Sequence, residues 1–552
     1  MLWPAIAAFL TTGGWYLLSG WPIQLLIALR QKESTAEGII LGIIHNIRNI
    51  MQRPLIVGAL TGLLIGDFKT GLEVGAVVQL MFLGVFVVGA SIPPNPLVAT
   101  ALAVVFVSRA GASVGEAVAF VLPVAVLSQM LMMACLTWNS FFYQIGAKAA
   151  ADGDIKKVEL TNALLQPLMV LINCIPAFLG VYFGTGLVQK VVQAFPAWLT
   201  AGFGKLGGIL PLLGFALLLY TMVPGSLTVL FIAGFIVGSL ANVPPLAMAA
   251  IAVCLAVFVE SLRDREAGEE MTLEPAGVQA GGSGGRRLSL SERVSLWWRN
   301  TCWFNVASWD VLGGWGFAYQ MVPVIRRLCP DRKDRAEALS RHMTFWNTNI
   351  HAGAVIPGMV VALEEEHAED PQRVTAETVQ SVKVATMGPL AGIGDSIFHA
   401  TLAPIILALG SAMVQAGNSF GLWLSIVLLM LMYAGAIWYL LDYGYRLGVN
   451  VLTQLRAGGL IDRIAEGAKI TGLIVAGTMS AKLSNLAFKV SYTAGGQVIE
   501  LQKILNGFMP KLPELALVFV IYWLLKKGVS ALWITLALMV FAVLGAFFGF
   551  LA

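Results

Sequence analysis

The sequence has 552 residues, 58% of them hydrophobic and only 12% charged, with a formal net charge of +4. Soluble domains carry about 25% charged residues, so this composition excludes an ordinary soluble protein, and the length exceeds one ordinary core. The modest charge bears on orientation in a membrane rather than on acidic partners, and no nucleic-acid partner is expected. Five cysteines without paired spacing predict neither a disulfide framework nor a metal site.

Apolar runs long enough to cross a bilayer recur along the chain. A helix needs about 20 mainly apolar residues to cross about 30 Å of hydrocarbon, so the predicted fold class is an all-α polytopic membrane protein. The first run lacks the basic start and the cleavage site of a signal peptide, so we expect it to be retained. It closes at residues 25–29, and further runs include 116–135, 168–182, 227–259, 422–441 and 531–551.

A glycine-rich segment in the first half predicts a helical hairpin. Glycines recur at a spacing of four over 58–66, which places small residues on one helix face and permits close packing. The apolar run there has about 12 residues, too few to span, and it ends at Gly66-Asp67, followed by Lys69 and Glu73. Such a segment is typical of a re-entrant hairpin whose charges line a polar site. The alternative is an interfacial turn where Asp67 and Lys69 merely meet water.

One strong compositional break runs from Ser261 to Ser295. It contains AGGSGG at 280–285 and no apolar periodicity, which predicts a flexible aqueous linker. Arginines and lysines cluster in and just after this break, so by the positive-inside tendency it faces the cytoplasm. We therefore expect membrane domains at 1–260 and 296–552, joined by a cytoplasmic linker at 261–295. The second domain opens with charged, tryptophan-rich sequence, whose helical spacing predicts amphipathic helices at the membrane surface or packed on a membrane domain.

The second half carries a counterpart to the Gly-Asp segment. Glycines at spacings of four and two lead into Gly394-Asp395, within Met387–His399. Two corresponding hairpins in two similar halves are what an inverted-repeat transporter shows, with its substrate at their interface. The polar stretch Phe345–Asn349 adds amides and aromatic surface, which suit sugar hydroxyls and a pyranose face. The alternatives are an ordinary turn for Gly394-Asp395 and helix capping for the polar stretch.

Catalytic chemistry has no visible basis in the sequence. The five histidines stand in no Ser/His/Asp or metal-ligand constellation, and no Walker A sequence is present. We expect no catalytic residue, no phosphoryl-acceptor site, no metal and no cofactor in this chain.

Motifs in both halves resemble one family, the mannose/fructose/sorbose-type sugar phosphotransferase system. The first half looks like its C membrane component, and the second half, from about Trp297 to the end, is similar to its D component. The C-type matches are Gln52–Leu55, Gly66–Gly71 and Gly75–Gln79, and the D-type matches are Met321–Leu328, Arg341–His342, Phe345–Asn349, Ala362–Glu365 and Lys383–Asp395.

The resemblance implies two pseudo-symmetric, inverted membrane halves, each with a re-entrant hairpin. It implies a homotrimer in the bacterial inner membrane, in contact with lipid. It also implies uptake of a hexose or amino-sugar, which a separate, phosphorylated cytoplasmic B component would phosphorylate after charging by an A component. The phosphorylated histidines of that system lie on the A and B components.

Four departures from the family pattern bear on the sugar contacts. Gln52 stands where C components have histidine, and the acidic residue usual just upstream is missing from 45–49. The family's Ser-Trp-Asn motif is Ser308–Asp310 here, and the sequence after it is two residues shorter. His399 follows Phe398 where the family often has tryptophan.

The first hypothesis is therefore a phosphotransferase-type sugar permease. Carboxylates in its site would accept hydrogen bonds from hydroxyls, amides would donate and accept, and Trp309 or Phe398 would cover an apolar ring face. The alternatives are a diverged, non-transporting receptor or sensor of the same fold, and a cation-coupled secondary transporter. The candidate substrate-binding residues are Asp67, Lys69, Gln79, Trp309, Asn347, Asn349, Asp395, Phe398 and His399.

Overall fold

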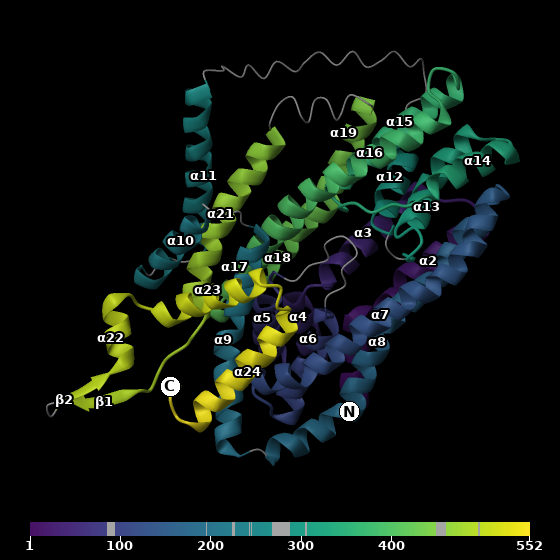
Figure 1. Ribbon diagram of the computed structural model, residues 1–552. Helices are drawn as coiled ribbons and strands as arrows, with labels where there is room; N and C mark the ends of the chain where they lie inside the picture. Colours follow the sequence, from purple (N-terminus) through teal and green to yellow (C-terminus); the bar gives the residue numbers. More distant parts are fainter. Residues whose placement is uncertain are drawn as a thin grey trace.

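The computed structural model describes residues 1–84, 94–194, 196–222, 227–241, 243, 245–267, 288–303, 306–448, 460–494 and 497–551. These residues are almost entirely helical (Figure 1), and five of their helices are long and apolar enough to cross a membrane. The predicted all-α polytopic fold class is confirmed. A short antiparallel hairpin, formed by β1 (Ser491–Ala494) and β2 (Gln497–Glu500), is a small addition that the sequence did not indicate.

The first half contains eleven α-helices within its described residues, with a π-helical turn, η1, between the first two. They are α1 (Leu2–Phe9), η1 (Leu10–Gly14), α2 (Trp15–Arg30), α3 (Thr35–Met51), α4 (Pro54–Ile65), α5 (Phe68–Met81), α6 (Pro96–Ala110), α7 (Val114–Ala151), α8 (Ile155–Gln193), α9 (Ala197–Met222), α10 (Thr228–Leu240) and α11 (Pro245–Ala267).

The second half has three irregular helical turns among its described residues, η3, η4 and η5. Its helices are α12 (Leu290–Asn300), α13 (Gly314–Leu328), α14 (Arg332–His342), η3 (Ala352–Ala354), α15 (Val355–Glu369), α16 (Ala376–Gly394), η4 (Asp395–Leu402), α17 (Ala403–Gln415), α18 (Phe420–Met430), η5 (Leu431–Gly435), α19 (Ala436–Leu447), α21 (Leu460–Leu483), α22 (Leu501–Phe508), α23 (Leu512–Lys526) and α24 (Ala531–Phe547).

Helices α4 and α5 form the hairpin predicted at Gly66-Asp67. Gly66 has a φ of 79°, which a side chain would strain, and it ends α4 in the left-handed conformation. The glycine spacing also acts as predicted, because a Cβ atom on Gly58 would lie 2.5 Å from the carbonyl oxygen of Gly71 and 2.5 Å from the Cα of Gly75. The two helices can therefore touch through their backbones.

The second predicted hairpin, at Gly394-Asp395, is wrong. Asp395 has φ −63° and ψ −39°, and the chain runs from α16 through the π-helical η4 into α17 as one 40-residue helical segment. Thr401 Oγ1 donates to the carbonyl oxygen of Ser396, five residues back, at 2.7 Å. A glycine inside a helix costs only about 1 kcal/mol, so packing of the long apolar flanks outweighs the local turn signal.

A hairpin of the expected kind does occur in the second half, one helix later. Gly417, at φ 82°, turns α17 into α18, and a Cβ atom on Gly421 would lie 2.3 Å from the carbonyl oxygen of Gly410. This hairpin packs on the first one, with α17 against α5. Gly410 also comes close to the first hairpin, since a Cβ there would lie 3.3 Å from Leu55 Cδ2 of α4.

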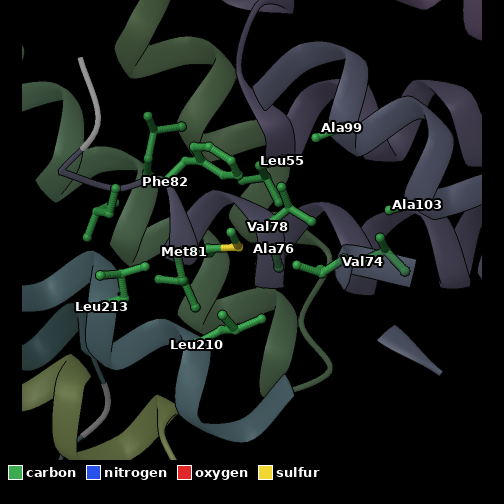
Figure 2. Packing of buried hydrophobic residues seen from close by; sticks show 14 of the residues in the cluster. Leu55, Val74, Ala76, Val78, Met81, Phe82, Ala99, Ala103, Leu210 and Leu213 are labelled. Carbon is green, nitrogen blue, oxygen red and sulfur yellow. The ribbon is translucent and has the colours of Figure 1, made fainter. Parts of the chain in front are cut away.

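The main hydrophobic core lies around these two hairpins. Figure 2 shows Leu55, Val74, Met81 and Phe82 from the α4–α5 region packed beside Leu210 and Leu213 of α9, with Ala99 and Ala103 of α6 at its edge. Buried residues of α17 and α21, from the second half, belong to the same cluster. The two halves therefore share one core rather than meeting as separate bodies.

Helices from the two halves are interleaved elsewhere as well. In Figure 1, α10 and α11 of the first half lie beside α21 of the second, and α24 lies along α9. The close fit of α10 and α21 depends on Gly477, where a Cβ atom would lie 2.0 Å from the carbonyl oxygen of Phe231. The single run predicted over 227–259 is broken between Leu240 and Pro245, because the consecutive prolines there cannot continue a helix.

A buried ion network joins the loop before α3 and helix α8 of the first half to α12 and α13 of the second. The guanidinium of Arg299 donates to Glu33 Oε2 and to Glu159 Oε1, both at 3.1 Å, and its side chain is 1% exposed. Arg326 donates to the other oxygen of Glu159 at 3.0 Å. Arg299 also lies over the rings of Trp298 and Tyr319, at 4.8 and 4.2 Å from their centroids.

The predicted linker falls mostly outside the described residues. Helix α11 continues to Ala267 and α12 begins at Leu290, so both ends of the 261–295 segment are helical. Its centre, 268–287, is not described, and the domain boundaries and the cytoplasmic placement stay predictions. Amphipathic helices were expected at the start of the second domain, and there Leu339 and His342 are buried on α14.

Candidate functional site

Asn349 lies at the centre of a polar cluster in the non-helical stretch before η3. Its side-chain oxygen accepts hydrogen bonds from the backbone N–H groups of His351 and Ala352, at 2.9 and 3.1 Å, which fixes the amide plane. Its Nδ2 then donates to Asp395 Oδ1 at 2.9 Å and lies 3.4 Å from His399 Nδ1. The π-helical η4 supplies both partners.

Within η4, Asp395 and His399 are one turn apart, with 3.3 Å between Oδ1 and Nδ1. Gly394 permits the close approach of this helix to Asn349, because a Cβ atom on Gly394 would lie 2.4 Å from the Asn349 side chain. The glycine that the sequence suggested as a turn residue therefore serves as a contact surface.

An aromatic group completes one side of the cluster. The Phe398 ring stacks on His351 with 4.6 Å between centroids, and Tyr433 of η5 meets the same imidazole edge-on, also at 4.6 Å. His351 is fully buried, and neither of its ring nitrogens has a hydrogen-bond partner among the described residues. Buried polar atoms are normally paired, so the unpaired ring nitrogens of this histidine are an exception among the described residues. We call Asn349, His351, Asp395, Phe398 and His399 the Asn349 cluster.

A second set of charges anchors the stretch that carries Asn349. Arg341 donates twice to Glu364, at 2.9 and 2.8 Å, and His342 Nε2 lies 2.9 Å from Glu364 Oε1. Lys383 Nζ donates to the carbonyl oxygen of His342 at 3.1 Å and to Thr344 Oγ1 at 3.2 Å. Burial raises the pKa of Glu364, but hydrogen bonds from His342 and Arg341 outweigh it and lower that pKa to about 2. The ends of the polar stretch are thus held rigidly.

Four of the nine sequence-predicted site residues come together in the cluster: Asn349, Asp395, Phe398 and His399. Asn347 is near it along the chain, and its backbone N–H donates to Met387 Sδ at 3.1 Å. His351 and Tyr433 were missed. The signal for His351 was its position two residues after Asn349, whereas nothing in the local sequence around Tyr433 indicated it.

The other predicted residues have separate surroundings. Asp67 caps α5 by accepting from the Thr70 N–H at 3.3 Å and bonds to Ser108 at the end of α6. The Lys69 side chain is 88% exposed beside Glu73, and Gln79 Oε1 accepts from the Leu55 N–H at 3.5 Å inside the hairpin. Trp309 donates to Thr137 Oγ1 of α7 at 3.1 Å. No described contact joins these four to the Asn349 cluster.

The cluster presents both hydrogen-bond donors and acceptors. Among the described residues, no three His, Cys, Asp or Glu side chains lie close enough together to hold a metal ion. A carboxylate, an amide and two imidazoles lie beside aromatic rings, and all of them come from the second half of the chain.

Comparison with known proteins gives the family. The model for the sorbose-specific IIC component of the phosphotransferase system matches residues 34–258, and that for the mannose/fructose/sorbose family IID component matches 287–551. The chain belongs to the mannose/fructose/sorbose family of the sugar phosphotransferase system, with C- and D-type regions in one polypeptide. It is a multi-pass permease protein of the bacterial inner membrane, in a family that works with a sugar and with cytoplasmic A and B components.

Individual relatives match each half. The mannose-specific EIID component of Escherichia coli K12 is 34% identical over 267 residues, covering 47% of this chain and 94% of the relative. The N-acetylgalactosamine permease IIC component 1 of the same organism is 35% identical over 184 residues, covering 33% and 69%. A chain in a solved complex of mannose transporter ManYZ with microcin E492 is 32% identical, with a TM-score of 0.29, over 49% of this chain and all of that chain.

Proposed function

We propose that this permease imports a hexose or an amino-sugar and that the Asn349 cluster contacts the sugar. The relatives are named for mannose, fructose, sorbose and N-acetylgalactosamine, which are hexoses and an amino-sugar. The single observation that carries the site assignment is the Asn349–Asp395 hydrogen bond of 2.9 Å, beside the buried His351 whose ring nitrogens are unpaired.

Each member of the cluster has a distinct role in this proposal. Asp395 accepts hydrogen bonds from sugar hydroxyls, and the Asn349 amide donates to a ring or hydroxyl oxygen when it exchanges part of its bond to Asp395. The two imidazoles, of His351 and His399, can each donate or accept. Phe398 covers the apolar face of the sugar, with Asn347 at the rim.

The hairpin residues have a supporting role in the proposal. Asp67 and Gln79 hold the α4–α5 hairpin together, and Lys69 and Trp309 lie on the surface. We propose that the residues of the hairpin, Asp67, Lys69 and Gln79, influence the sugar site only through the packing of α5 against α17. Substitutions at Lys69 therefore affect uptake less than substitutions at Asn349.

The phosphoryl group comes from outside this chain. We propose that a phosphorylated cytoplasmic B component, charged by an A component, phosphorylates the sugar as it leaves the cluster. No residue of this chain is assigned as a phosphoryl acceptor. We also propose that the chain assembles as a homotrimer in lipid, which native mass spectrometry of the detergent-extracted protein tests directly through the mass of the complex.

Uptake into membrane vesicles tests the function. The vesicles contain this chain and are supplied with the cognate A and B proteins, phosphoenolpyruvate and a radiolabelled hexose or amino-sugar. We expect sugar phosphate inside the vesicles, and its absence with every sugar tried overturns the proposal. Sugar binding without any uptake would identify a receptor or sensor, and uptake without phosphoenolpyruvate would identify a secondary transporter.

A further inference from the structure

Helix α22 (Leu501–Phe508) and the β-hairpin before it stand away from the main core of the protein (Figure 1). No residue of α22 is buried. Its large apolar side chains are open to the outside, with Leu501 37%, Ile504 45% and Phe508 81% exposed, and Tyr492 of the hairpin is exposed as well. Apolar side chains grouped in this way mark an interaction surface, because water is a poor solvent for them.

The apolar and polar residues of α22 lie on opposite faces, as their spacing of three and four residues requires. The apolar face consists of Leu501, Ile504, Leu505 and Phe508, and the polar face contains Gln502, Lys503 and Asn506. Gln502 Oε1 accepts from the Phe488 N–H at 2.9 Å, and its Nε2 donates to Asn506 Oδ1 at 3.1 Å. The polar face is therefore tied to the neighbouring chain, and the apolar face is the one left exposed.

The helix that follows sets the direction of α22. Helix α23 is apolar between Lys511 at its start and Lys526 and Lys527 at its end, and the carboxylate within it, Glu514, is buried. Lysines at both ends of an apolar helix are typical of a segment that runs across a membrane, because they reach toward the headgroups. The axes of α22 and α23 differ by 81°. Since α23 runs across the hydrocarbon, α22 lies close to the plane of the membrane.

The charge around α22 is positive. Between positions 485 and 511 the charged residues are Lys489, Glu500, Lys503 and Lys511. The Lys503 side chain is 76% exposed, with its Nζ 2.9 Å from Glu500, and Lys489 is exposed too. A second copy of this chain on the same face would repeat these lysines, whereas the phosphates of anionic lipids would offset them. The charge therefore favours a lipid surface over a second copy.

We propose that α22 is an interfacial helix that rests on the surface of an anionic lipid bilayer. Its apolar face inserts at the boundary between headgroups and acyl chains, as amphipathic surface helices do. Lys489 and Lys503 contact lipid phosphates. The chain that leaves the membrane at Lys511 is thus held at the bilayer surface instead of extending into water. The proposal is independent of the sugar site.

Electron paramagnetic resonance on the full-length protein in lipid nanodiscs tests the insertion. A nitroxide is attached to a cysteine introduced by Phe508→Cys on the apolar face or by Asn506→Cys on the polar face. Cys254→Ser and Cys329→Ser remove the two native thiols that are not buried. Collisions of the nitroxide with oxygen, which concentrates in lipid, are compared with collisions with a water-soluble nickel chelate. The nanodiscs contain phosphatidylglycerol or phosphatidylcholine.

We expect the ratio of oxygen to nickel collisions to be several-fold higher at position 508 than at position 506. The ratio at 508 should also be higher in phosphatidylglycerol than in phosphatidylcholine, and Lys503→Gln should lower it toward the phosphatidylcholine value. Lys157→Gln is the matched control, since Lys157 is 64% exposed and pairs with Asp154 three residues away at 3.2 Å, as Lys503 pairs with Glu500. It should leave the ratio unchanged.

Two results at position 508 overturn the insertion. Access of the nickel chelate equal to that at position 506 would mean that the face meets water. Access of neither reagent would mean that protein covers it, as a second copy would. A ratio that is equal in the two lipids, or unaffected by Lys503→Gln, overturns the contact with phosphates. Elution volumes and thermal midpoints equal to those of the wild type exclude misfolding, and Ile504→Cys supplies a second apolar position if Phe508→Cys does not fold.

Discussion

Arg53 in the C-type region donates a hydrogen bond to the hydroxyl of Tyr433 in the D-type region, with 2.5 Å between nitrogen and oxygen. The Tyr433 ring in turn lies edge-on against His351 of the Asn349 cluster. The proposed sugar contacts, all from one region, are thus tied to the motif Gln52–Leu55 of the other. Any movement of Arg53 is transmitted to the wall of the cluster.

Replacing Tyr433 with Phe tests that connection. The ring remains, but Arg53 loses its acceptor, and its Nε already lacks a partner among the described residues. Hydrogen bonds to charged groups contribute roughly 1.5–3 kcal/mol, so kcat/KM for uptake should fall by about tenfold or more. Tyr439→Phe is the control, because Tyr439 is 66% exposed. In a double-mutant cycle with Arg53→Gln, additive effects would contradict the coupling.

Asn349→Asp should abolish sugar uptake at neutral pH. The substitution keeps the oxygen that caps His351 and Ala352 but replaces the donor facing Asp395 with a second carboxylate. Two carboxylates in contact cannot both stay ionised cheaply, so one should take up a proton as the pH falls. We expect the KM for the sugar to fall as the pH is lowered in this variant, and not in the wild type. A variant whose KM follows the wild-type pH profile would show that Asn349 does not face the sugar through Nδ2.

Acid should weaken the anchor formed by Glu364. Its pKa falls from 4.5 to about 2 on folding, so the stability it contributes is fully present above pH 4.5 and is lost as the pH falls toward 2. The shift corresponds to roughly 3 kcal/mol. Thermal unfolding in detergent from pH 7 to 3 should show this loss in the wild type. Glu364→Gln should start less stable and lose less over the same range, and parallel curves would contradict the assignment.

Gly58→Ala should separate α4 from α5. The new methyl group would lie 2.5 Å from two backbone atoms, which cannot move aside as a flexible side chain can. Overpacking of this kind costs about 1–3 kcal/mol, and the thermal midpoint should fall accordingly. Gly186→Ala on α8 is the matched control, since nothing lies within 4 Å of its added Cβ. Equal midpoints for the two variants would mean that the hairpin does not need backbone contact.

Arg299→Met should be the most destabilising change at the boundary between the two regions. It leaves Glu33 and Glu159 buried with less compensating charge, and breaking a buried ion pair typically costs about 3–5 kcal/mol. Combining it with Glu33→Gln and Glu159→Gln should restore part of the stability. Measuring thermal midpoints for the single and triple variants checks this, and a triple variant worse than the single one would refute it.

The helical fold class, the α4–α5 hairpin and the site residues Asn349 and Asp395 could be predicted from the sequence, each for a physical reason. The length of an apolar run determines whether it can form a membrane-spanning helix. The four-residue glycine spacing determines which faces of α4 and α5 touch. Asn349 and Asp395 were recognised because amides and carboxylates are conspicuous in apolar surroundings. Asn349 lies in a non-helical stretch and Asp395 in η4, 46 positions later, so their spacing in the sequence could not show that they pair.

The remaining features depend on tertiary packing. Gly394 looks like a turn glycine locally, and only the approach of Asn349 shows that it is a helix contact. Tyr433 lies 380 positions from Arg53, a separation at which no local pattern is informative. The π-helical turns η1, η4 and η5 leave no clear sequence signal, yet they position Trp15, Asp395 and Tyr433. Gln79, one of the predicted site residues, accepts a hydrogen bond from the Leu55 N–H inside the hairpin, a contact that no local pattern indicated.

The buried ion network also bears on how such a protein is produced. Its anions, Glu33 and Glu159, belong to the C-type region, and its cations, Arg299 and Arg326, belong to the D-type region. Either region made in excess would therefore lack the opposite charges that neutralise its side of the network. When the two are separate chains, their synthesis has to be balanced. A single polypeptide produces the C-type and D-type regions in equal numbers. The covalent connection therefore matters more for their stoichiometry than for holding the two regions together.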